Sequence, residues 1–69
     1  MTQDDKLTRF LGILEDHKTE LGLKPGEYGF ADDNRFMLNL SPRMRKFAND
    51  LYTKYGRLLE SKTKINFGL

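Results

Sequence analysis

The sequence contains no cysteine and a single histidine, His17. Without Cys the chain cannot be a small secreted scaffold held together by disulfides. A structural zinc site normally draws four ligands from Cys and His, and one His does not supply them. We therefore expect neither a metal nor a cofactor in this protein.

The sequence also lacks a run of about 18 apolar residues, the length that a transmembrane helix requires. The segment Met1–Asp5 is polar and acidic and is not followed by an apolar stretch typical of a signal peptide. These two absences predict a cytoplasmic protein that does not act at a membrane.

The 69 residues predict one small domain, residues 1–69, because no repeat or linker divides them. A domain of this size buries little surface per residue. Five Phe and three Tyr supply large contact areas in compensation. Self-association or a bound partner would add further support, so an oligomer is one possibility.

Charge is distributed unevenly along the chain. Residues 1–40 hold five Lys or Arg against eight Asp or Glu, a net charge of −3, whereas residues 41–69 hold seven against two, a net charge of +5. Such asymmetry can steer a charged partner, or it can let the two halves of the chain attract each other.

The pattern that organises the chain is a long amphipathic helix at about residues 42–62. Ser41 and Pro42 are a strong helix start, because Ser accepts bonds from free N–H groups and Pro fits the first helical position. Apolar residues then recur at steps of three and four: Met44, Phe47, Ala48, Leu51, Tyr55 and Leu58. Gly56 interrupts this stripe, but Leu58 keeps the phase set by Leu51, so we predict a continuous helix with a close contact at Gly56.

One flank of this helix is basic, and it is the candidate site. The flank carries Arg43, Lys46, Lys54 and Arg57 together with Asp50, and Tyr52 lies on the opposite margin of the apolar stripe. One interpretation is a solvated flank whose long side chains cover the edge of the core. The other is a docking strip for an acidic protein surface or for phosphates.

A first helix is predicted at about residues 3–21. Leu7, Phe10, Leu11 and Leu14 share one face, and Gly22 followed by Pro25 is typical of a helix end. His17 lies at the edge of this face, and no nucleophile can be paired with it from the sequence, so we predict no catalytic role for it.

The middle of the chain predicts a β-hairpin at about residues 27–40. Pro25-Gly26 is typical of a type II turn, residues 28–31 alternate large and small side chains, and residues 35–40 alternate apolar and polar ones. The Asp32-Asp33-Asn34 cluster between the two strands is interpreted as a turn, because it lacks the spaced ligands of a calcium loop.

The segment 64–69 places Ile65, Phe67 and Leu69 in phase, as a strand does. It would add a strand to the hairpin, cover the core, or dock on another molecule. The order helix, hairpin, helix, strand predicts an α+β fold, with two helices packed on one face of a small antiparallel sheet. The predicted core is Leu7, Phe10, Leu11, Leu14, Leu21, Phe30, Phe36, Leu38, Phe47, Leu51, Tyr55, Leu58, Ile65 and Phe67.

No residue pattern predicts catalysis, and a chain this short has little room for a substrate pocket, so we expect no enzyme and no small-molecule substrate. The leading hypothesis is a small protein-binding module, such as an adaptor, an inhibitor or an assembly component. Its partner would be another protein, bound by Arg43, Lys46, Tyr52, Lys54 and Arg57. The alternative is a nucleic-acid-binding protein that contacts phosphates through the same strip.

Overall fold

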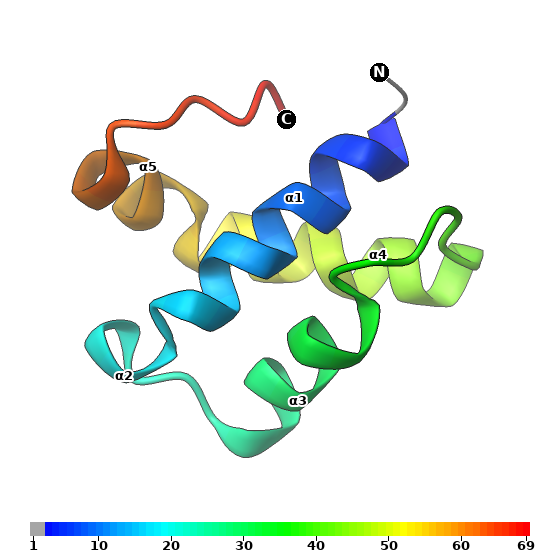
Figure 1. The fold of residues 1–69 in the computed structure, drawn as a ribbon, viewed down its shortest axis with the longest axis horizontal. Coiled ribbons are helices and arrows are strands. Elements are labelled where there is room, and N and C mark those ends of the chain that lie inside the picture. Colours follow the sequence, from blue (N-terminus) through cyan, green and yellow to red (C-terminus); the bar gives the residue numbers. More distant parts are fainter. Residues whose placement is uncertain (1–2) are drawn as a thin grey trace.

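A computed structural model describes residues 3–69 and shows a helical protein (Figure 1). No strand occurs among the described residues, so the predicted α+β fold is wrong. The elements in chain order are α1 (Gln3–Asp16), α2 (Lys18–Leu21), α3 (Pro25–Asn34), α4 (Pro42–Leu51), the π-helix η1 (Tyr52–Gly56) and α5 (Arg57–Thr63).

Helix α1 is the centre of the molecule and crosses in front of the long helix formed by α4, η1 and α5 (Figure 1). Four of its side chains have no solvent exposure: Leu7, Phe10, Leu11 and Leu14. The predicted helix 3–21 corresponds to α1 and α2, which are separated at His17. It ends at Gly22, which adopts a left-handed conformation.

Helix α3 occupies the place of the first predicted strand. Pro25 is the first residue of the helix rather than the second residue of a turn, because its fixed φ suits both positions. The Glu27 carboxylate accepts the Lys24 N–H at 2.9 Å and so caps the helix start. The small residue Ala31 is buried and allows α3 to pack closely on α1.

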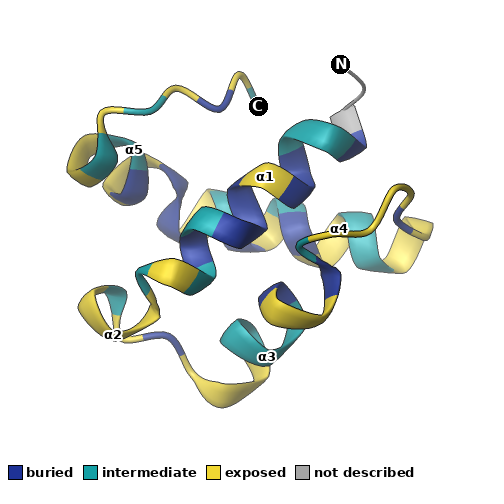
Figure 2. Cartoon of the chain, in the orientation of Figure 1, coloured by how far each residue is buried: buried dark blue, intermediate teal, exposed yellow. Residues whose placement is uncertain are grey.

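The second predicted strand, residues 35–40, is the connection between α3 and α4. A strand needs a neighbour for its backbone hydrogen bonds, and the helical α3 supplies none. Phe36 and Leu38, which we placed in the core, are instead 85% and 82% exposed. Figure 2 shows this connection exposed along most of its length. Only Leu40, at its end, is buried.

The long helix is continuous through Gly56, as predicted, but it contains a π turn at η1. A π turn holds about one residue more than an α turn, so the residues after it are rotated by roughly 100° relative to a regular helix. This rotation explains a second error in the predicted core. Leu59 is buried and Leu58 is 51% exposed, the reverse of the regular pattern.

Gly56 allows η1 to form around a tyrosine ring. A Cβ atom at Gly56 would lie 2.4 Å from Cδ2 of Tyr52, which is closer than any real contact. The close contact predicted at Gly56 is therefore made within the molecule, to a side chain one turn earlier in the same helix.

The segment 64–69 runs back from α5 toward α1 as an irregular chain and not as a strand (Figure 1). Phe67 is buried, and its ring meets the Phe10 ring edge to face with centroids 5.3 Å apart. The Phe67 N–H donates to Glu60 Oε2 at 3.1 Å. The segment thus covers the core of its own chain, one of the alternatives raised by the sequence.

The remaining differences in the core follow from these corrections. Phe47 is 41% exposed because the sheet expected to cover it does not exist. Leu21, Phe30 and Ile65 pack only at the margin of the core. The buried apolar residues that the sequence reasoning missed are Leu23, Ala31, Leu40, Ala48 and Leu59.

Candidate protein-binding surface

The structure separates the five residues of the predicted site. Arg43 and Lys46 lie in the first half of α4, whereas Tyr52 and Lys54 lie in η1 and Arg57 begins α5. Because η1 rotates everything after it, Arg57 no longer shares the flank of Arg43 and Lys46. The continuous basic strip predicted from a regular helix is therefore broken at η1.

Tyr52 is used by the fold. Its ring meets Phe10 edge to face at a centroid distance of 5.3 Å, and its hydroxyl donates to Glu60 Oε2 at 3.2 Å. Burial, followed by the hydrogen bond to the Glu60 carboxylate, raises the pKa of Tyr52. Glu60 also holds the Phe67 N–H, so Tyr52 belongs to the contacts that fix the C-terminal segment.

Lys54 is also occupied. Its Nζ donates to Glu27 Oε2 at 3.1 Å, and this hydrogen bond to the Glu27 carboxylate raises the pKa of the Lys54 amine. Tyr55 donates its hydroxyl to the other Glu27 oxygen at 2.8 Å. Glu27 therefore joins α3 to η1, and Lys54 is part of an internal contact although half of its side chain is exposed.

Arg45, which the sequence reasoning did not select, forms a further internal pair. Its Nε and Nη2 donate to the two carboxylate oxygens of Asp4, at 2.9 and 3.1 Å. These hydrogen bonds, together with one from the Leu40 N–H, lower the pKa of Asp4. Asp4–Arg45 and Glu27–Lys54 are attractions between the acidic and basic halves of the chain, the second of the two explanations raised for the charge asymmetry.

Arg43 and Lys46 remain exposed, and neither makes an ion pair or hydrogen bond with the side chains that the structure describes. Phe47 follows directly and is partly exposed, with its ring centroid 4.5 Å from that of Phe30 on α3. The start of α4 thus presents two unpaired cations beside an aromatic side chain. Arg57 is exposed as well, beside Tyr52 and away from this group.

The structure exposes Phe36, Met37 and Leu38, which the sequence reasoning did not predict as surface residues. The signal available was three consecutive apolar residues between Asn34 and Asn39, which we interpreted as a strand.

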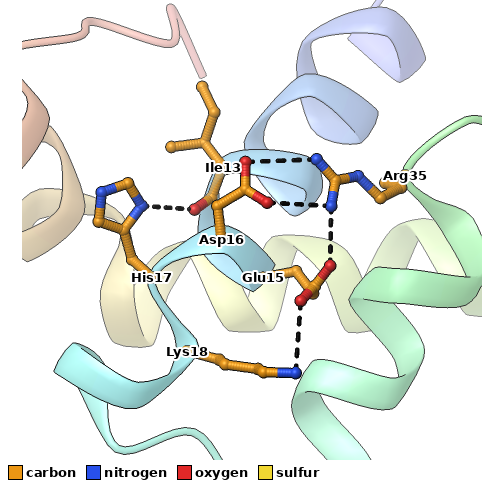
Figure 3. Close-up of polar contacts among 6 residues, drawn as sticks. All are labelled: Ile13, Glu15, Asp16, His17, Lys18 and Arg35. Carbon is orange, nitrogen blue, oxygen red and sulfur yellow. Dashed lines mark hydrogen bonds and ion pairs between the residues drawn. The ribbon is translucent and has the colours of Figure 1, made fainter.

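Arg35 holds the near end of this segment to α1 (Figure 3). Its Nη1 lies 2.7 Å from Glu15 Oε1 and 3.1 Å from Asp16 Oδ1, and its Nη2 lies 3.3 Å from Asp16 Oδ2. These carboxylates, Asp16 foremost, raise the pKa of the Arg35 guanidinium. Gly12 gives the guanidinium room, since a Cβ there would lie 3.3 Å from Arg35 Nε.

Residues 3–69 contain neither a candidate metal site nor a membrane-spanning helix. No group of three or more His, Cys, Asp or Glu side chains among them could hold a metal ion. His17, between α1 and α2, donates its Nδ1–H to the Ile13 carbonyl of α1 at 2.9 Å (Figure 3). No helix in this part of the chain is long and apolar enough to cross a membrane.

Searches of protein-family models, curated proteins and solved structures found no match to this chain.

Proposed function

We propose that the protein is a small non-enzymatic protein-binding module, an adaptor, inhibitor or assembly component, that binds through the basic flank at the start of α4. The observation that carries the proposal is the pair Arg43 and Lys46, which are exposed and unpaired among the described residues beside a partly exposed Phe47. Cations next to an aromatic ring are typical of the residues that anchor protein interfaces.

The alternative, binding of nucleic acid through the same strip, is less well supported. Nucleic-acid binding depends on many phosphate contacts from Lys and Arg. Of the cations along the long helix, Arg45 and Lys54 are paired with carboxylates of the same chain. Arg57 is displaced by η1. Two adjacent cations and an apolar neighbour fit a protein surface better than a phosphate backbone.

The test compares capture of partner proteins from a nuclease-treated lysate by three forms of the chain. These are the wild type, the charge-reversed variant Arg43→Glu/Lys46→Glu, and the control Arg57→Glu, which reverses an exposed cation outside the proposed surface. We expect the double variant to lose the captured proteins and the control to retain them. Circular dichroism must show that all three are folded.

A gel-shift titration at two salt concentrations addresses the alternative. Phosphate contacts would give an affinity that falls steeply as salt rises. Such a shift, lost in the Arg43→Glu/Lys46→Glu variant, would replace the proposed function with nucleic-acid binding. Capture that is equal for all three forms would exclude the start of α4 as the binding surface.

A further inference from the structure

The two most exposed large apolar side chains of the described residues, Phe36 and Leu38, lie in the connection between α3 and α4. Phe36, Met37 and Leu38, here called the apolar loop, are consecutive and exposed. The contact recorded for the Phe36 ring is with the neighbouring Arg35, whose Cζ lies 5.3 Å from the ring centroid. Single exposed apolar residues are ordinary, but a run of three large ones is typical of an interaction site.

The apolar loop is held at both ends by α1. Before it, Arg35 bonds to Glu15 and Asp16 near the end of α1. After it, the Leu40 N–H donates to Asp4 Oδ2 at 3.1 Å near the start of α1, and the Leu40 side chain is buried. A loop fixed at both ends loses little conformational freedom when it binds, which favours affinity.

The stretch of sequence that contains the apolar loop and the first half of α4 carries positive charge only. Residues 34–49 contain four Lys or Arg and no Asp or Glu. Arg35 and Arg45 are neutralised by carboxylates of α1, and this leaves Arg43 and Lys46, in the first half of the helix that follows the apolar loop, as the unpaired cations of residues 34–49. A complementary partner would present apolar side chains flanked by carboxylates.

We propose that the apolar loop and the start of α4 bind an acidic amphipathic segment of a partner protein. Phe36 and Leu38 contact its apolar side chains, and Arg43 and Lys46 pair with its carboxylates. This inference rests on the proposed function and names the chemistry of the partner. A second copy of the chain is disfavoured, because a symmetric contact through this surface would bring the unpaired cations of the two copies together.

The experiment selects binding peptides from a displayed library of random sequences against the full-length protein. The selected peptides are then titrated against Phe36→Ala, Leu38→Ala and the charge-reversed variant Arg43→Glu/Lys46→Glu. Leu58→Ala is the matched control, because Leu58 is an exposed leucine on α5, at the other end of the long helix (Figure 1).

We expect the selected peptides to combine Asp or Glu with large apolar residues. Each alanine variant of the apolar loop should weaken binding by about tenfold or more, the loss typical of an interface anchor. The charge-reversed variant should weaken binding at low salt most strongly. Leu58→Ala should bind with unchanged affinity.

Peptides that depend on Arg43 and Lys46 but bind Phe36→Ala and Leu38→Ala normally would overturn this inference and leave the proposed function in place. A library that yields no binder, or only basic peptides, would overturn it as well. Self-association that is lost in Leu38→Ala, measured by sedimentation, would assign the apolar loop to a second copy instead. If neither the wild type nor any variant captured a partner protein from the lysate, that result would count against the proposed function itself.

Discussion

The connection between α3 and α4 and the π turn η1 both interrupt regular helix, and both carry aromatic side chains. In η1 the two tyrosines point into the fold and donate their hydroxyls to Glu60 and Glu27. In the connection, Phe36 is 85% exposed and the backbone is fixed on either side of it. The aromatic side chains of η1 therefore point into the fold, whereas the aromatic side chain of the connection points into solvent.

The two regions differ in what their aromatic side chains contact. Those of η1 are held by internal contacts, and that of the apolar loop is left exposed and available for binding. At η1 each unusual feature is explained by an internal contact: Gly56 by the Tyr52 ring, Lys54 by Glu27, and Tyr52 by Glu60. At the apolar loop the internal contacts hold the ends and leave the apolar residues between them exposed. Changes at η1 should therefore affect stability, and changes at the apolar loop should affect binding.

The largest effect on stability is expected from Gly56→Ala. The new Cβ would overlap the Tyr52 ring, and overpacking of this kind costs about 1–3 kcal/mol. Alanine recovers about 1 kcal/mol through its higher helix propensity. We expect a net loss of up to about 2 kcal/mol in the free energy of unfolding, measured by urea denaturation. In a Tyr52→Ala background the same substitution should no longer destabilise, because the overlapping ring is absent.

Acidification should weaken the contact that ends the apolar loop. Hydrogen bonds from Arg45 and Leu40 hold the Asp4 pKa below its ordinary value of 3.8, so the unfolded chain takes up a proton at a higher pH than the folded one. The stabilisation is complete above the ordinary pKa and is lost as the pH falls through the lowered one. Urea midpoints measured from about pH 7 to about pH 3 should decline accordingly.

Arginine substitutions test the cause of this decline. Arg45→Met removes the main partner of Asp4 and should give a protein that is less stable at neutral pH and declines less steeply in acid. Arg43→Met is the matched control, since Arg43 has no ion-pair partner among residues 3–69. Equal acid profiles for Arg45→Met and the wild type would contradict the role assigned to the Asp4–Arg45 pair.

A smaller effect of opposite sign is expected from Gly29→Ala in α3. A Cβ at Gly29 meets no atom within 4 Å, so the substitution adds helix propensity without a clash. The free energy of unfolding should rise by about 0.4–1 kcal/mol. A loss of stability at Gly29, measured as for Gly56→Ala, would show that the penalty at Gly56 is not specific to the Tyr52 ring.

The smallest effect is expected from Phe36→Ala and Leu38→Ala. Both side chains are mostly exposed, so truncation should change the free energy of unfolding by less than about 0.5 kcal/mol. Thermal denaturation followed by circular dichroism would measure this change. A loss of 2 kcal/mol or more, about the cost of truncating a buried leucine, would mean that the apolar loop packs inward.

The sequence predicted correctly those features that depend on the residues of a single helix. The buried face of α1 follows from its spacing, and Ser41 Oγ accepts the Met44 N–H at the predicted start of α4. Pro25 was ambiguous, because the same fixed φ serves a turn and a helix start. We interpreted Pro25 as part of a turn, and this interpretation led to the predicted hairpin. The predicted sheet in turn depended on that hairpin.

The internal contacts of the site residues could not be predicted, because they are made with side chains of distant elements. Nothing near Lys54 in the sequence indicates Glu27 of α3, and nothing near Arg45 indicates Asp4 of α1. The π turn could not be predicted either. Leu58 and Leu59 are both apolar, so the sequence supplies an apolar residue for the core with or without the extra residue of the π turn. Arg43 and Lys46 were placed at the surface correctly because they need no partner to stay there.

The extra residue held in η1 has a consequence for variation in chain length. Leu51 and Leu59 are eight positions apart and both face the core, whereas a regular helix would align positions seven apart. Deleting Thr53 would therefore restore an ordinary turn and keep both leucines directed inward. A deletion within α1 would instead turn half of its buried face toward water, because α1 has no π turn that holds an extra residue. The long helix should therefore accept the loss of one residue at η1, where a regular turn would replace the π turn.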